Sequence, residues 1–375
     1  MNLQPRYWLA VGALVGSLGL IAGCAGDPPN PRAAFSERVD KELSTAYQPA
    51  HHETAGWGAT WQVDQQSVNV AWLAPVTQER VPLIIYLPGL GESASGGVAW
   101  RKAWAQAGYA VLSVQEHAHD QSVFASQQAT YGDFRGMASP HYSAAALRER
   151  LSTLQKVLTE VRARAAKGDA QLAAIDWNQV VVAGFDFGAQ TAEALAGALE
   201  PGATSGVAIQ PKAVVLLSPY VDADARPDMY ARLSAPVLSM TGQQDEDPFN
   251  WVSSYRQREV LGDSVTVAGS VRLDLNSATH KTLAGSELFS RPAKQAEKGG
   301  DATGDAPKGR GHKHGPKPGG NSSMAGEPAP DPKQVAAIQA IGVAFLDSRV
   351  KHNPAATEWL QKSAPAWLGE AGRLK

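Results

Sequence analysis

One stretch decides how this chain folds: QVVVAGFDFGAQT, which runs from Gln179 to Thr191. Its apolar residues 180–183 predict a buried β-strand, and the small residues of 189–199 predict a helix directly after the turn. Gly184 and Gly188 flank a sharp turn that would push the side chain of Asp186 out over a sheet. This strand–turn–helix is typical of a nucleophile elbow. Because Ser is its usual occupant, the Asp decides which chemistry is open to the chain.

Apolar runs and helical patterns alternate along the rest of the sequence. Strands are predicted at residues 83–87, 110–114, 213–217, 236–240 and 271–275, and helices at 98–106, 144–165, 335–350 and 355–361. Alternating runs at 61–64 and 68–72 predict two antiparallel edge strands. Continuous Val, Leu and Ile runs separated by helices indicate an α/β fold, with a mostly parallel central sheet and helices on both faces.

Two connections bear on how the carboxyl end of this sheet is covered. Residues 220–235 are too few to form a cap between two strands, so we expect no large cap domain. The stretch 116–142 is long enough either to form a roof over a functional site or to form a loop that extends into solvent. The aromatic residues Trp57, Trp61, Trp100 and Trp104 are more typical of packing than of ligand stacking.

The overall composition bounds the class of protein. With 375 residues, of which 43% are hydrophobic, the chain can bury a full core in one large domain or two small ones. A net charge of -2, with basic residues scattered along the sequence, gives no electrostatic footprint for nucleic acid. We therefore set nucleic-acid binding aside.

The N-terminus has the pattern of a secretory signal. Arg6 supplies a basic flank, and the apolar run from Tyr7 to Ala22 ends in the sequence IAGC. These last residues resemble a bacterial lipobox, which implies cleavage before Cys24 and acylation of that cysteine. Ala25 follows where Asp would resemble an inner-membrane retention signal, so we expect a lipoprotein in the outer membrane, facing the periplasm. The alternative, a transmembrane anchor, needs a longer apolar run. Cys24 is also the only cysteine, which excludes an internal disulfide.

The composition divides the chain into five parts. Residues 1–23 are the predicted signal peptide, and 24–55 a tether that contains a proline-rich start. Residues 56–290 form the predicted α/β domain, which the helices of 333–375 complete. Residues 291–332 are rich in Gly, Pro, Lys and Asp and predict a disordered surface insertion. Its His312 and His314 stand among lysines and lack the ligand set of a zinc site, so we expect a solvated loop there.

Three features beyond the elbow lie where a hydrolase needs them. The turn LPGLG, residues 87–91, follows a buried strand and can aim backbone N–H groups, with that of Phe187, at a developing oxyanion. Asp245 follows the strand that ends near residue 240, and His280 follows the last predicted strand. The order nucleophile, acid, His is that of the α/β-hydrolase fold. Asp247 is an alternative acid, and we favour Asp245 as the residue that reaches the His ring.

These four motifs together resemble the α/β-hydrolase superfamily. The branch most similar is that of the dienelactone-hydrolase and platelet-activating-factor-acetylhydrolase-like esterases, and the resemblance covers about 60–345 without the insertion. It implies an α/β-hydrolase fold in which His280 activates water and Asp245 orients the His280 ring. Leu90 and Phe187 would supply the oxyanion donors. The chain departs from the branch at three positions, with Pro88 and Phe185 in place of His and with Asp186 in place of Ser.

The chemistry of a carboxylate limits what the elbow can do. Asp186 can attack an sp3 carbon and form an alkyl ester that a His-activated water hydrolyses, or it can act as a base toward water. Haloalkane dehalogenases resemble this elbow, but they usually carry Trp where Phe187 stands; epoxide hydrolases also resemble it, but they use tyrosines from a cap. We expect a lipid-anchored hydrolase acting on a small ester-type or related apolar substrate, with no cofactor or metal. The alternative is a degenerate pseudo-hydrolase that serves as an envelope binding or scaffold protein.

Overall fold

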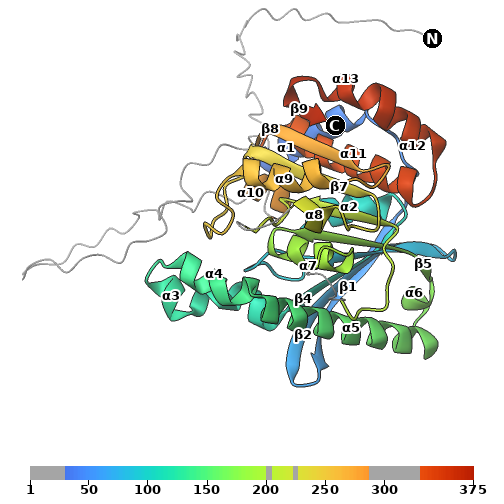
Figure 1. The fold of residues 1–375 in the computed structure, drawn as a ribbon. Helices are drawn as coiled ribbons and strands as arrows, with labels where there is room; N and C mark the ends of the chain where they lie inside the picture. The colour runs from blue at the N-terminus through green and yellow to red at the C-terminus, as the bar shows by residue number, and fades with distance from the viewer. Residues whose placement is uncertain (1–29, 200–204, 223–226, 287–329) are drawn as a thin grey trace, which may run out of the picture.

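The computed structural model describes residues 30–199, 205–222, 227–286 and 330–375. These residues form one sheet in the order β1-β2-β4-β3-β5-β6-β7-β8-β9 (Figure 1). The strands are β1 Thr54–Val63, β2 Gln66–Pro75, β3 Val81–Leu87, β4 Ala110–Glu116, β5 Ile175–Phe185, β6 Ala213–Leu217, β7 Val237–Gln244, β8 Val271–Thr279 and β9 Gly372–Leu374. Pairing is parallel from β4 to β8 and antiparallel at β1–β2, β2–β4 and β8–β9.

Helices lie on both faces of this sheet (Figure 1). They are α1 Pro31–Leu43, α2 Val98–Gln106, α3 Gln127–Thr130, α4 Phe134–Tyr142, α5 Ala144–Ala166, α6 Ala170–Ala173, α7 Phe187–Leu195, α8 Pro227–Tyr230, α9 Tyr255–Ser264, α10 His280–Ala284, α11 Pro332–Arg349, α12 Pro354–Glu358 and α13 Ala364–Leu368. One apolar cluster joins the sheet to α5 and α7, and the other joins it to α1, α2 and α11. The expected α/β architecture with both faces covered is therefore confirmed.

The elbow itself is a tight turn between β5 and α7. Asp186 is its only residue and has a φ of 45°, in the region that L-residues rarely adopt. A Cβ on Gly184 would lie 2.4 Å from the carbonyl oxygen of Gly188. A Cβ on Gly188 would lie 1.9 Å from the carbonyl oxygen of Leu87. Only glycine fits at these two positions, so the strand, the helix and the turn after β3 pack closely around Asp186.

The predicted strands match the sheet closely, whereas several elements were not predicted, among them α9 and β9. The expected antiparallel edge pair is β1 and β2, and the helix expected at 98–106 is α2 with those bounds. Helix α9 was missed because its sequence is polar and buries only Arg258 and Leu261. Strand β9 has three residues, too few to give an alternating pattern.

The predicted tether extends too far at its C-terminal end. Residues 31–43 form α1, which begins with Asn30 as its N-cap and Pro31 in its first turn. Phe35 and Val39 of this helix are buried in the cluster that contains α11, and the Tyr47 hydroxyl donates to Asp347 at 2.9 Å. Proline is common both in the first turn of a helix and in proline-rich linkers. The prolines near residue 31 therefore led to the prediction of a linker where α1 begins.

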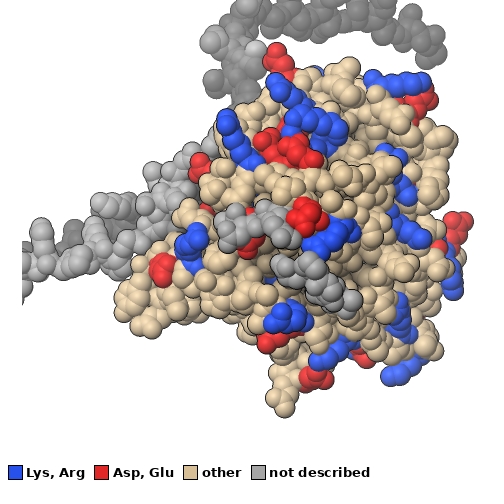
Figure 2. Space-filling model, in the orientation of Figure 1, with Lys and Arg blue, Asp and Glu red and all other residues tan. Residues whose placement is uncertain are grey.

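Several predictions fall outside the described residues. These are the signal peptide, Cys24, the first part of the tether, and the insertion up to residue 329 with its two histidines. In the described ranges, no helix combines the length and apolar character needed to cross a membrane. Figure 2 shows one face of the molecule, on which acidic and basic side chains are interspersed.

Candidate functional site

The acid and the histidine of the predicted constellation lie together at the carboxyl end of the sheet. Asp245 directly follows β7, and His280 begins α10 directly after β8. Nδ1 of His280 lies 2.8 Å from Oδ1 of Asp245. The carboxylate of Asp245 also accepts hydrogen bonds from the hydroxyls of Ser218 at 2.8 Å and Thr241 at 3.0 Å. The acid is thus fixed in the orientation that holds one side of the His ring.

Asp247, the alternative acid, has a different role. Its carboxylate accepts hydrogen bonds from the backbone N–H groups of Phe249, Trp251 and Val252, at 2.6 to 2.8 Å. These bonds close the loop after β7, as a capping carboxylate does. The choice of Asp245 as the partner of His280 is therefore the one that the geometry supports.

Charge and burial set the protonation of this pair. Burial alone would raise the pKa of Asp245, but the nearby guanidinium of Arg258 and the hydrogen bond with His280 lower it below its ordinary value. Burial alone would lower the pKa of His280, yet its hydrogen bond with Asp245 and the nearby charge of Asp186 raise it. Both shifts favour an ionised acid beside a protonated imidazole.

The carboxylate at the elbow is enclosed by other side chains. Asp186 is 1% exposed, its Oδ2 accepts a hydrogen bond from the Tyr142 hydroxyl at 2.7 Å, and its Oδ1 lies 3.2 Å from Nη1 of Arg258. The Arg258 side chain is 0% exposed, and its Nε lies 3.4 Å from Oδ2 of Asp245. One buried guanidinium therefore bridges the carboxylates of Asp186 and Asp245. Each oxygen of Asp186 therefore accepts one hydrogen bond from a buried side chain.

An aromatic layer covers this network from the side of the long connection after β4. Tyr142, the last residue of α4, stacks on Tyr220 at 5.3 Å and on Trp251 at 5.2 Å between ring centroids. Its ring edge also meets Phe187 at 5.3 Å. Of the two alternatives for residues 116–142, the roof is therefore correct for the end of α4. Helices α3 and α4 themselves project from the body of the molecule (Figure 1).

The glycine-rich turn after β3 is held by a carboxylate that the sequence analysis missed. Glu92 accepts a hydrogen bond from the backbone N–H of Gly89 at 2.9 Å and another from the hydroxyl of Ser286 at 2.5 Å. Burial raises the pKa of Glu92. The Gly89 carbonyl accepts from the Gln115 side chain at 2.9 Å. The turn carrying Leu90 is thus fixed on both sides. An acidic residue directly after the glycine-rich turn is the sequence signal from which this role of Glu92 could have been predicted.

The predicted oxyanion donors lie on either side of this arrangement. Leu90 is buried in the turn after β3, and Phe187 is the first residue of α7, where helix N–H groups are free of intrahelical partners. Phe185, on the other side of the elbow, packs its ring 4.7 Å from that of His280. The structure therefore brings all five predicted site residues to one end of the sheet.

Two residues of the site had no usable signal in the sequence. Arg258 lies in a polar helix, where a buried arginine has the same sequence context as an exposed one. Tyr142 lies 44 residues from Asp186 in the chain, in an irregular connection. Within the described ranges, no group of three or more His, Cys, Asp or Glu side chains is arranged to hold a metal ion. No protein-family model matches the chain, and a search of the curated proteins finds no match either.

Proposed function

We propose that this chain is a lipid-anchored protein of the bacterial envelope with an α/β-hydrolase fold, and that it acts as a binding or scaffold protein without turnover. The observation that carries the proposal is the state of Asp186. Its carboxylate is buried, paired with Arg258 and hydrogen-bonded by Tyr142, so the nucleophile position has become part of the network that holds the fold.

The order of the elements supports the hydrolase fold. The elbow residue follows β5, the acid follows β7 and the histidine follows β8, which is the chain order nucleophile, acid, His. The mostly parallel sheet and the strained φ at Asp186 agree with an elbow. The fold alone does not establish an activity, because one fold serves many functions.

The energetics of the buried pair oppose catalysis. If Asp186 attacks a substrate, its carboxylate loses its negative charge, and its bonds to Tyr142 and Arg258 weaken while all three groups remain buried. Hydrogen bonds to charged groups contribute about 1.5–3 kcal/mol each. That cost would add to the barrier of the chemical step. Arg258 also draws electron density from the attacking oxygen, since a neutralised carboxylate is a weaker nucleophile and base.

A second candidate is a hydrolase that uses Asp186, and one observation favours it. The Asp245–His280 pair keeps the geometry of a catalytic acid and base, and the His280 side chain is 14% exposed. In that candidate Asp186 is the nucleophile or a base toward water, His280 activates water, and Asp245 orients the His280 ring. The enzyme would act on a small ester-type or related apolar substrate without metal or cofactor.

Turnover assays separate the two candidates. We expect the mature chain to show no hydrolysis of short-chain p-nitrophenyl esters, epoxides or haloalkanes above the level of its His280→Ala variant. An esterase activity that appears in Asp186→Ser, where the usual nucleophile stands beside His280, would add support. A wild-type activity that His280→Ala abolishes, with the circular-dichroism spectrum unchanged, would establish the hydrolase and reject the proposal.

The membrane anchor is tested separately. We expect the full-length chain to be labelled by radioactive palmitate in a bacterial host and to fractionate with outer membranes. Cys24→Ala should lose both properties, because it removes the only cysteine that an acyl group can modify. If the Cys24→Ala variant still fractionates with membranes, the protein is not anchored by an acyl group on Cys24.

A further inference from the structure

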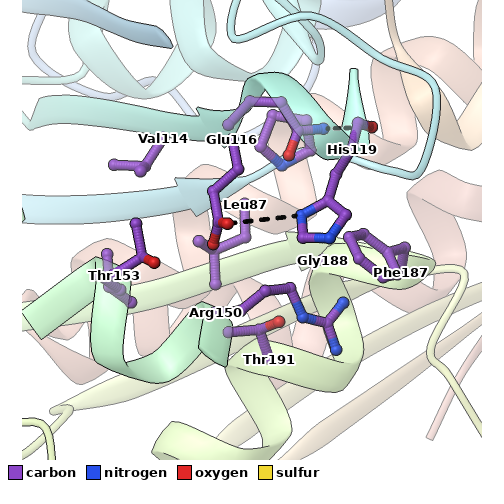
Figure 3. A pocket seen from close by; sticks show the side chains of 12 residues that line it. Leu87, Val114, Glu116, His119, Arg150, Thr153, Phe187, Gly188 and Thr191 are labelled. Carbon is purple, nitrogen blue, oxygen red and sulfur yellow. Dashed lines mark hydrogen bonds and ion pairs between the residues drawn. The ribbon is translucent and has the colours of Figure 1, made fainter. Parts of the chain in front are cut away.

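A small cavity lies beside the elbow helix (Figure 3), and neither Asp245 nor His280 lines it. Its volume is about 30 Å³, and it lies between α5, α7 and the ends of β3 and β4. The polar side chains that line it include those of Glu116, His119, Arg150 and Thr153, with Phe187 and Gly188 of the elbow on one side. None of these four polar residues belongs to the site described above.

Arg150 is a buried cation with few partners. It is 5% exposed, its guanidinium lies 3.8 Å above the ring of Phe187, and it donates a hydrogen bond to the neutral side-chain oxygen of Gln190. Two of its nitrogens, Nε and Nη1, are buried and have no hydrogen-bond partner among the residues that the structure describes. Because a buried charge is normally paired, two unused donors of a guanidinium beside a cavity indicate a missing acceptor.

The neighbouring groups do not supply that acceptor. His119 is 7% exposed, and its Nδ1 lies 4.0 Å from Oε2 of Glu116 and makes no hydrogen bond within the described part of the chain (Figure 3). Burial lowers the pKa of His119 to about 3, so the ring is neutral near pH 7. Burial raises the pKa of Glu116, and it lowers that of Arg150 only to about 10, which leaves the guanidinium charged. The cavity is therefore lined by the Arg150 cation, by a neutral ring that can donate one hydrogen bond, and by the carboxyl group of Glu116, which interacts with the charge of Arg150 but does not accept a hydrogen bond from its Nε or Nη1.

We propose that this cavity binds one monatomic anion of the size of chloride, held by Nε–H and Nη1–H of Arg150 and by Nδ1–H of His119. A water molecule needs roughly 10–15 Å³ of such space, so about 30 Å³ is enough for one halide ion. The ion neutralises Arg150 beneath the Phe187 ring. It thereby fastens α5 to the first turn of α7, independently of whether Asp186 reacts.

Thermal unfolding of the mature chain tests this site. Sodium chloride is replaced stepwise by sodium gluconate at constant ionic strength, so that only the identity of the anion changes. We expect the unfolding midpoint to rise with chloride and to saturate, as binding to the native state alone requires. Arg150→Met should abolish the chloride dependence. Arg162→Met is the matched control, because Arg162 also covers an aromatic ring, that of Trp177, and it should keep the dependence.

A second readout needs no variant. In crystals of the unaltered chain grown in bromide, anomalous scattering should place one bromide within hydrogen-bond distance of Nε or Nη1 of Arg150. Equal midpoints in chloride and gluconate, or a cavity that holds only water in the bromide crystals, would overturn the proposal.

Discussion

Arg258→Met is expected to lower the free energy of unfolding by about 3–5 kcal/mol, the usual cost of breaking a buried ion pair by removing one partner. The loss is large because Arg258 serves two carboxylates, those of Asp186 and Asp245, and both stay buried after the change. The measurement is urea unfolding at pH 7 followed by circular dichroism. Arg256→Met, two residues earlier on the exposed side of α9, is the control and should leave the midpoint unchanged.

A double-mutant cycle shows whether the cost arises in the network. Asp186→Asn alone leaves Arg258 with one carboxylate fewer, whereas in the Arg258→Met background it removes a buried charge that has lost its cation. We therefore expect Asp186→Asn to be less damaging in that background than in the wild type, with a coupling energy of about 1–3 kcal/mol. Additive effects of the two changes would mean that Asp186 and Arg258 do not depend on each other.

Gly188→Ala is expected to lower the free energy of unfolding by about 3 kcal/mol or more, toward the upper end of overpacking costs. The new methyl would lie 1.9 Å from the Leu87 carbonyl oxygen and 2.7 Å from that of Pro88, and backbone atoms cannot move aside as a flexible side chain does. Helix propensity alone predicts the opposite sign, a gain of up to about 1 kcal/mol for Ala over Gly within α7.

The control for this prediction is Gly58→Ala in β1. The nearest atom to a Cβ there is the Val70 carbonyl oxygen at 3.8 Å, an ordinary contact, so the effect should stay within about 0.5 kcal/mol. Both variants are compared by thermal unfolding and by yield of soluble protein. A stable, well-expressed Gly188→Ala would show that the turn after β3 does not press on the elbow.

The sequence predicted well what depends on local pattern. The apolar runs that became β3, β5, β6 and β7 are continuous because these strands are buried on both faces, and such runs are visible without any neighbours. Asp245 and His280 were predicted from their positions directly after two strands and from the chain order nucleophile, acid, His. Strand order in the chain was enough to bring them together.

The sequence did not predict what depends on distant partners. Nothing near residue 258 distinguishes an arginine that bridges two buried carboxylates from one on a surface, because the bridge joins α9 to residues 13 and 72 positions away. The same is true of Tyr142, whose bond to Asp186 depends on how an irregular connection folds back. The position of Asp186 was therefore predictable, whereas the engagement of both its oxygens was not.

The most direct test of the account asks whether Asp186 ever forms a bond to a substrate. The mature chain is incubated in molar excess over each candidate ester, epoxide and haloalkane in water enriched in oxygen-18, and the peptide containing Asp186 is then isolated and its mass determined. We predict that this peptide keeps its natural mass, since both carboxylate oxygens remain with Tyr142 and Arg258. Incorporation of oxygen-18 into Asp186 would contradict the account and establish covalent catalysis at the elbow.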